Sequence, residues 1–150
     1  MKKASSFLVV VFAVLTAFFI AAGPVMAKMV AVKNENVNMR SGPSTKNKVL
    51  WKLGKGFPLQ VLRRSGSWYK VRDFEGATGW IHRSVVNSSG HMIVKRRKIN
   101  IRSRPTTRSR VVAKANYGVV FKTLKKTKNW IKVKHGDLTG WISRNLLWGF

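Results

Sequence analysis

Apolar and polar residues alternate along short stretches of the chain after residue 27, and turn-forming residues separate these stretches. Such stretches, rich in β-branched and aromatic residues, predict strands. In the first half of the chain the predicted strands are Met29–Val32, Val37–Arg40, Val49–Leu53, Pro58–Arg64, Trp68–Arg72 and Thr78–His82. No stretch after residue 27 shows the 3.6-residue apolar period of an amphipathic helix. The pattern therefore predicts an all-β protein.

The same pattern occurs twice, at an offset of 62 residues. The matching segments are Val37–Pro43 with Ile99–Pro105, Trp68–Val71 with Trp130–Val133, and Thr78–Ile81 with Thr139–Ile142. One residue is lost from a turn of the second copy before the last of these matches. Two copies are too few for a solenoid. We therefore expect two tandem small β-barrels, over residues 28–87 and 91–150, joined by a linker at residues 88–90.

The first 27 residues have the three-part layout of a secretory signal peptide. Lys2 and Lys3 provide the positive start, an apolar run extends from Phe7 to Ala22, and Ala27 ends a small-residue cleavage pattern. This run is shorter than the ~20 residues of a membrane-spanning helix, although an uncleaved membrane anchor is the alternative. We expect cleavage after Ala27, export to the periplasm or to the cell wall and exterior, and membrane contact only if the segment is retained.

The repeated motifs resemble the signature of bacterial SH3 domains. The resemblance is carried by Asn38–Pro43, Gly56, Trp68–Val71 and Gly79–Ile81, and the second copy keeps the signature except at Arg104, where the family usually has a small residue. It implies an SH3-like barrel. It also implies a non-catalytic targeting module, typically attached to cell-wall hydrolases, that holds peptidoglycan or its peptide parts.

Strand alternation separates a core face from an outward face in each copy. Trp68 and Lys70 share one face of their strand, and Tyr69 lies on the other. The aliphatic Ile131 at the position of Tyr69 marks that second face as core. Trp68 and its counterpart Trp130 are therefore expected on the outward, basic face.

An outward tryptophan beside basic residues suits stacking on a sugar, gripping a peptide or receiving a cation. The alternative is that loops cover these rings and form a second small core, and this interpretation is favoured for Trp80 and Trp141. In the second copy Ala113 replaces Trp51. The candidate ligand-binding residues are Trp51, Trp68, Lys70, Trp80, Trp130, Lys132 and Trp141.

The chain carries 30 Lys and Arg residues against four acidic residues, a formal net charge of +26. Residues 28–90 account for +9 and residues 91–150 for +15. Charge of this size attracts polyanions. The residues expected to contact an anionic polymer are Lys95, Arg96, Arg97, Lys98, Arg102, Arg104, Arg108 and Arg110. Nucleic acid is a physically competent ligand, but export disfavours it as the physiological one.

Several residues of each copy are expected to be structural. Arg40 and Asn38 should order the loop that follows their strand, and Arg102 and Asn100 should do the same in the second copy. The apolar end of the chain, 146–150, should close the second barrel, because Leu146 aligns with Val85.

The residue types that catalysis requires do not converge in the sequence. His82, His91 and His135 are isolated, and Asp73 and Glu75 lie in a turn where solvated acids are expected. The chain has no cysteine, which excludes disulfides and thiolate catalysis. A Ser–His–acid arrangement stays open, but no G-x-S-x-G motif is present. We expect no enzyme, no metal and no cofactor.

Three hypotheses follow. The first is a binding protein for peptidoglycan or another anionic envelope polymer. The second is an adaptor that recruits a partner protein, such as an envelope hydrolase, through a peptide in the SH3-like groove. The third, a cell-wall hydrolase, rests only on the frequent fusion of such domains to these enzymes.

Overall fold

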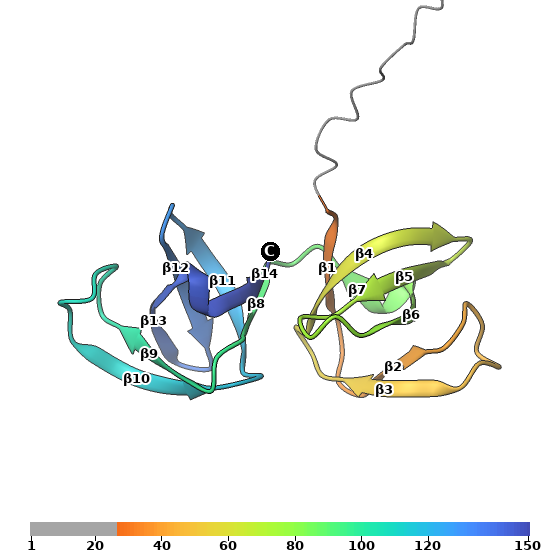
Figure 1. Ribbon diagram of the computed structural model, residues 1–150, viewed down its shortest axis with the longest axis horizontal. Coiled ribbons are helices and arrows are strands. Elements are labelled where there is room, and N and C mark those ends of the chain that lie inside the picture. Colours follow the sequence, from red (N-terminus) through yellow and green to blue (C-terminus); the bar gives the residue numbers. More distant parts are fainter. Residues whose placement is uncertain (1–26) are drawn as a thin grey trace, which may run out of the picture.

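The computed structural model describes residues 27–150, which form two β-barrels (Figure 1). Each barrel is one antiparallel sheet of seven strands. The first contains β1 (Met29–Val32), β2 (Val37–Arg40), β3 (Val49–Leu53), β4 (Pro58–Ser65), β5 (Trp68–Arg72), β6 (Thr78–His82) and β7 (Val86–Asn87). The second contains β8 (His91–Val94), β9 (Lys98–Arg102), β10 (Val111–Asn116), β11 (Val120–Lys126), β12 (Trp130–His135), β13 (Leu138–Ser143) and β14 (Leu147–Gly149).

The strand order is the same in the two sheets, β3-β2-β6-β5-β4-β1-β7 and β10-β9-β13-β12-β11-β8-β14. This arrangement confirms the prediction of two tandem SH3-like barrels. The only helices in the described part of the chain are two short 3-10 turns, η1 (Arg83–Val85) and η2 (Arg144–Leu146). Except for Ala27, the predicted signal peptide lies outside the described residues, so its cleavage stays a prediction. No helix among residues 27–150 is long and apolar enough to cross a membrane.

Each barrel has its own apolar core, to which residues from several of its strands contribute. Val71, Ile131 and Val133 are buried, as strand alternation predicts. The core of the first barrel is formed by Val30, Val32, Val37, Met39, Leu53, Leu59, Val71, Ile81 and Val86. The core of the second is formed by Met92, Val94, Ile99, Ile101, Ala115, Phe121, Ile131, Val133, Ile142 and Leu147. Burial of one large aliphatic side chain contributes about 1.5–3 kcal/mol, and in a chain without disulfides these cores are the main source of stability.

The two barrels share their irregularities as well as their strands. The pairing of β4 with β5 shifts between Val61 and Arg63, and that of β11 with β12 shifts between Thr123 and Lys125. The residues at the two shifts, Leu62 and Leu124, are both exposed.

The loops after β2 and β9 are held by the arginine that ends each strand. Nη1 of Arg40 donates to the carbonyl oxygens of Thr45 and Asn47, both at 2.9 Å. Nη1 of Arg102 donates to the carbonyl oxygen of Ser109 at 2.8 Å. The loop-ordering role predicted for the two arginines is confirmed. Asn38 does not share it, because its Oδ1 is buried without a hydrogen-bond partner.

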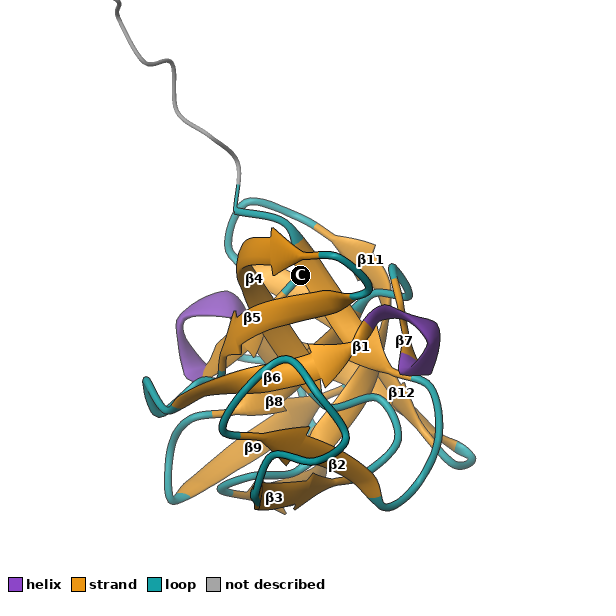
Figure 2. Cartoon of the chain, turned by 90° about the vertical axis from the view of Figure 1, so that its right-hand side faces the viewer, coloured by secondary structure: helices purple, strands orange, loops and turns teal. Residues whose placement is uncertain are grey.

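The carboxy end of the described chain closes the second barrel, as predicted. Strand β14 pairs with β8, with Leu147 opposite Val94. In the first barrel the equivalent closing strand is β7, which pairs with β1. Figure 2, turned by 90°, shows the first barrel in front of the second and the strands wrapping around each core.

The two barrels are in direct contact, at a surface that we call the junction. The ring of Phe74 packs against that of Tyr117, with centroids 5.2 Å apart. The hydroxyl of Tyr117 donates a hydrogen bond to the carboxylate of Glu75. Gly56 approaches His91 so closely that a methyl group there would lie 2.7 Å from the imidazole Cδ2. The junction therefore joins the β3–β4 and β5–β6 turns of the first barrel to the second barrel.

Candidate functional site

The first barrel has a groove between the loops that flank β2 and the ends of β5 and β6. Its volume is about 330 Å³. We call it the first groove, and it is lined by Asn34, Glu35, Asn36, Val37, Asn38, Arg40, Thr45, Trp68, His82 and Val85. The ring of Trp68 meets that of His82 edge-on, with centroids 5.2 Å apart. The groove thus combines an aromatic ring, a guanidinium and several side-chain amides.

The second barrel has a groove in the same place, with a volume of about 240 Å³. This second groove is lined by Lys98, Ile99, Asn100, Arg102, Thr107, Trp130, Ser143 and Leu146. Each of these residues aligns with one that lines the first groove, for example Trp130 with Trp68 and Arg102 with Arg40. The repeat therefore carries the groove as well as the fold.

Comparison of the sequence with known protein families identifies the family of the two barrels that carry the grooves. The family model described as "Bacterial SH3 domain" matches residues 33–87 and 95–149. The chain belongs to this family. The two bacterial SH3 domains together account for most of the chain, and the matched segments contain Trp68, Trp130 and nearly all of the residues that line both grooves.

Known proteins with similar sequence or structure are longer than this chain. A Bacillus subtilis (strain 168) protein named "Putative N-acetylmuramoyl-L-alanine amidase YrvJ" is 25% identical over 123 residues, which cover 75% of this chain and 24% of that protein. The structure of NlpC1 from Trichomonas vaginalis has 13% identity and a TM-score of 0.35, covering 81% of this chain and 45% of that one. An NlpC/P60 family protein from Bacillus cereus ATCC 10987 has 12% identity and a TM-score of 0.36, covering 79% and 55%. The chain spans about a quarter of the length of its curated relative.

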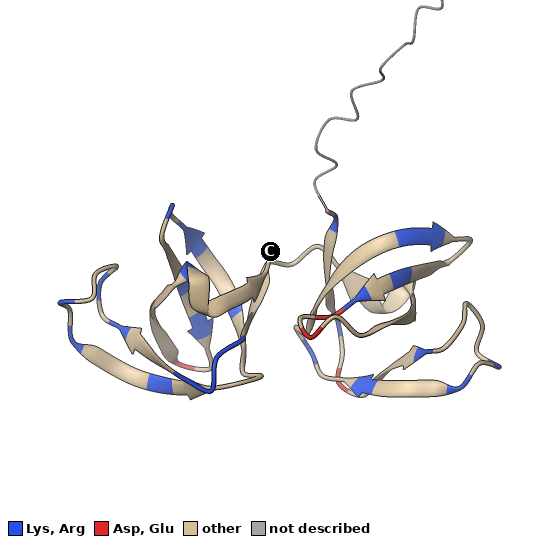
Figure 3. Cartoon of the chain, in the orientation of Figure 1, with Lys and Arg blue, Asp and Glu red and all other residues tan. Residues whose placement is uncertain are grey.

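The two grooves differ in charge. The first SH3 domain places Glu35 beside Arg40 in its groove, whereas the second has Lys98 and Arg102. Figure 3 shows basic positions in both domains and acidic positions mainly in the first. The second groove therefore favours an anionic group, and the first can accept a group of either sign.

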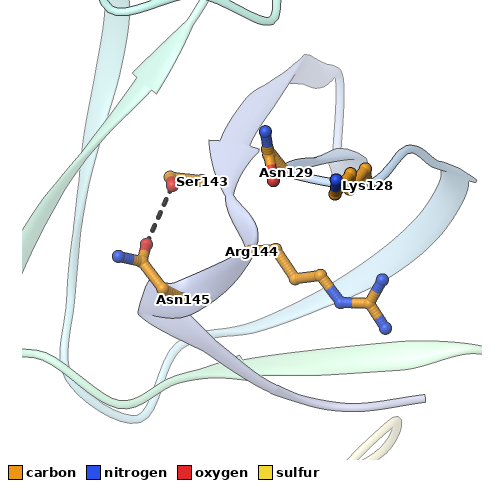
Figure 4. A pocket seen from close by; sticks show the side chains of 5 residues that line it. All are labelled: Lys128, Asn129, Ser143, Arg144 and Asn145. Atoms are coloured by element: carbon orange, nitrogen blue, oxygen red, sulfur yellow. Dashed lines mark hydrogen bonds between the residues drawn. The ribbon is translucent and has the colours of Figure 1, made fainter.

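A polar basin continues the second groove on the far side of Ser143. It has a volume of about 460 Å³ and is lined by Lys128, Asn129, Ser143, Arg144 and Asn145 (Figure 4). Oγ of Ser143 donates to Oδ1 of Asn145 at 2.8 Å. Gly66 stands at the position of Lys128 in the first SH3 domain, so the cationic basin belongs to the second. The strand pattern did not single out Lys128 and Arg144, because only folding brings the β11–β12 turn beside η2.

The other tryptophans predicted as ligand contacts lie outside both grooves. Trp80 is 7% exposed. The guanidinium carbon of Arg63 lies over its ring, 4.7 Å from the ring centroid. This burial agrees with the interpretation that Trp80 belongs to the packed interior. Trp141 is half-buried, and Trp51, 56% exposed, lines a separate pocket at the junction.

The remaining basic candidates are distributed over the surface. Lys70 and Lys132 are half-buried, and they pair across strands with Trp80 and Trp141. Of the predicted polymer contacts, Lys98 and Arg102 line the second groove. The others are exposed in the β8–β9 turn and the β9–β10 loop: Lys95, Arg96, Arg97, Arg104, Arg108 and Arg110.

The histidines of the two SH3 domains are separated and already hydrogen-bonded. Nδ1 of His82 contacts Ser84 Oγ at 2.7 Å, and that of His135 contacts the carbonyl oxygen of Val120 at 3.0 Å. Within the described range, no group of three His, Asp or Glu side chains could hold a metal ion.

Proposed function

We propose that the chain is an exported, non-catalytic binding protein of the bacterial cell envelope whose two grooves hold peptidoglycan or another anionic envelope polymer. The observation that carries the proposal is the equivalence of the two grooves around Trp68 and Trp130. A duplicated groove provides two linked sites, and linked sites gain avidity when both bind one polymer.

The chemistry of the grooves favours a ligand with carboxylates or phosphates beside apolar surface. Arg40 and Arg102 present a guanidinium beside a tryptophan ring, a combination that binds an anionic group and packs against the adjacent chain. Lys98 adds positive charge to the second groove, and the basin that shares Ser143 with this groove adds that of Lys128 and Arg144. The acidic Glu35 allows the first groove to receive a segment that also carries an amine, as a peptide does.

The relative's name supports the envelope as the place of action. That protein carries the name "Putative N-acetylmuramoyl-L-alanine amidase YrvJ", and the chain matches about a quarter of it. We propose that the shared part is a wall-binding part and that catalysis belongs elsewhere in the relative. The separated histidines of this chain fit a non-catalytic role.

The test is sedimentation of the purified protein with peptidoglycan sacculi at rising salt concentration. Exposed charge pairs weaken strongly with salt, whereas a packed aromatic contact does not. We expect retention in high salt, and its loss in the double variant Trp68→Ala, Trp130→Ala. The matched control is Leu62→Ala, Leu124→Ala, which removes two exposed apolar side chains at equivalent positions outside the grooves.

Three outcomes would contradict the proposal. Retention that disappears by moderate salt would assign binding to the net charge alone. Equal loss in the control and the groove variants would remove the grooves from the mechanism. Absence of sedimentation at every salt concentration would favour the second hypothesis, an adaptor that holds a partner protein through a peptide.

A further inference from the structure

A second kind of pocket lies beside the junction, and the proposed function does not use it. It has a volume of about 200 Å³ and is lined by Trp51, Lys52, Leu53, Phe57, Asp73, Phe74 and Glu75. Three aromatic rings therefore meet two carboxylates in one small cavity, which we call the junction pocket. Trp51, one of the lining residues, has 56% of its surface exposed.

The rings of the junction pocket are fixed by contacts from both barrels. Phe57 meets Phe74 edge-on, with ring centroids 6.0 Å apart. On its other side Phe74 packs against Tyr117, whose hydroxyl holds the carboxylate of Glu75. The second barrel thus supports one wall of a pocket that the first barrel lines.

The second carboxylate of the pocket is also held in place. Oδ1 of Asp73 accepts hydrogen bonds from the backbone N–H groups of Glu75 at 3.0 Å and of Ala77 at 2.8 Å. Asp73 is 9% exposed. Two fixed carboxylates against the one flexible ammonium of Lys52 give this pocket a negative balance, in a chain whose formal net charge is +26.

The second barrel lacks the aromatic residues that line the junction pocket. Ala113 and Val119 stand where the first barrel has Trp51 and Phe57. The shorter β12–β13 turn has Gly136-Asp137-Leu138 in place of Phe74-Glu75-Gly76-Ala77. That turn keeps one acidic residue, Asp137, but the aromatic residues of the junction pocket are a property of the first barrel alone, and duplication of the fold does not explain them.

We propose that the junction pocket binds an organic ammonium group. The faces of aromatic rings attract cations, tryptophan most strongly, and cages of several rings recognise alkylammonium groups. The carboxylates of Asp73 and Glu75 add attraction for positive charge and repel anions. A neutral sugar could stack on Trp51, but two carboxylates would contribute no charge complementarity to it. A quaternary headgroup and the primary amine of a peptide side chain share this chemistry.

Binding is measured by NMR titration of the purified protein, with the indole N–H signal of Trp51 as the reporter. The probes are choline for a quaternary ammonium and Nα-acetyl-lysine methylamide for a primary one. The neutral probe 3,3-dimethylbutanol has the shape of choline without its charge. We expect saturable binding of at least one ammonium probe, with the neutral probe at least about fivefold weaker.

Variants separate the pocket from the rest of the molecule. Trp51→Ala, which installs the residue of the second copy, should abolish binding as followed through neighbouring backbone signals. Glu75→Gln should weaken it several-fold. Tyr117→Phe removes the hydrogen bond to Glu75 but keeps the carboxylate, so it should retain binding. Trp68→Ala, in the first groove, should leave the junction pocket unaffected.

The proposal is overturned by any of four results. These are a neutral probe that binds as tightly as the tighter ammonium probe, binding that survives Trp51→Ala, absence of binding by both ammonium probes, or saturable binding of N-acetylglucosamine alone. The last result would identify a saccharide site. None of them depends on whether sacculi bind to the grooves.

Discussion

Tyr117 connects the two barrels through one hydroxyl group. Its pKa is raised above the ordinary value of 10.0, first by the hydrogen bond to Glu75, then by partial burial and by the negative charges of Glu75 and Asp73. A neutral phenol donates to the carboxylate, whereas a phenolate would repel it. Since the folded-state pKa is raised, the stabilising contribution is complete below the ordinary tyrosine pKa and is lost as pH rises through the raised value.

This sign gives a prediction about the titration of Tyr117. In a Tyr69→Phe background, where Tyr117 is the remaining tyrosine, the phenolate absorbance should appear at a higher pH than in a model peptide. The substitution Glu75→Gln should lower the midpoint, because it removes the charge and weakens the acceptor. The junction should consequently be intact at neutral pH. An unchanged midpoint in Glu75→Gln would contradict the hydrogen bond.

The sequence predicts the position of some side chains in the fold and not of others. The outward face of Trp68 and the core position of Ile131 follow from strand alternation, which depends only on neighbours in the same strand. The burial of Trp80 depends on Arg63, which reaches over its ring from β4. Contacts between strands of this kind require the sheet register, and no local pattern encodes them.

At the level of elements, Gly79 in β6 and Gly140 in β13 lie where two strands approach each other closely. A methyl group at Gly79 would lie 2.6 Å from Cγ of Met39 and 3.1 Å from the carbonyl oxygen of Arg40. At Gly140 it would lie 2.5 Å from Cγ2 of Ile101 and 3.1 Å from the carbonyl oxygen of Arg102. The absent side chain is what allows β6 to pack on β2 and β13 on β9.

We expect Gly79→Ala and Gly140→Ala each to lower the free energy of unfolding of the affected barrel by about 1–3 kcal/mol, because overpacking displaces core side chains. Gly140→Ala should cost more, since the β-branched Ile101 adapts less readily than Met39. The measurement is a urea series followed through amide signals of each barrel. Gly90→Ala is the control, because its methyl group would lie 3.5 Å from Cβ of Thr123, an ordinary contact. Equal effects at all three positions would contradict the packing argument.

The strands themselves were largely predictable. In the first barrel the strand bounds agree with the sequence pattern, except that β4 extends one residue further, to Ser65. Turn residues mark most strand ends chemically, which explains this agreement. The closing strand β7 has two residues, too few for any alternation, and it exists because β1 offers a free edge. Of the two grooves, the strand pattern predicts only the outward positions of Trp68 and Trp130. The other lining residues come from strands and loops that are distant in the sequence and meet only in the folded barrel.

At the scale of the whole molecule, we expect the affinity for an anionic polymer to depend more on where the basic residues lie than on the net charge. Lys128 and Arg144 border the basin beside the second groove. We expect Lys128→Ala, Arg144→Ala to weaken binding of poly-L-glutamate about two- to tenfold, the magnitude of two exposed charge contacts. The measurement is calorimetric titration at several salt concentrations.

The comparison for this prediction is Lys114→Ala, Lys122→Ala, which removes the same charge from exposed positions of the same barrel. If the net charge alone attracted the polymer, the two double variants would be equally weakened at every salt concentration. A smaller effect in the comparison variant would locate the contact at the basin, and the difference should be most visible at moderate salt, where only closely approaching charges still interact.

The contact at the junction is asymmetric, because the two barrels contribute different residues to it. The first barrel contributes Phe74 and Glu75 from its longer turn, and the second answers with Tyr117. The second barrel has no aromatic residue in its shorter turn, so it cannot offer the same half of the contact to another copy. A further copy of the second unit, placed after the present pair, would therefore lack this stacked and hydrogen-bonded contact with the unit before it. The contact is directional, because the preceding barrel supplies the longer turn and the following barrel supplies the tyrosine.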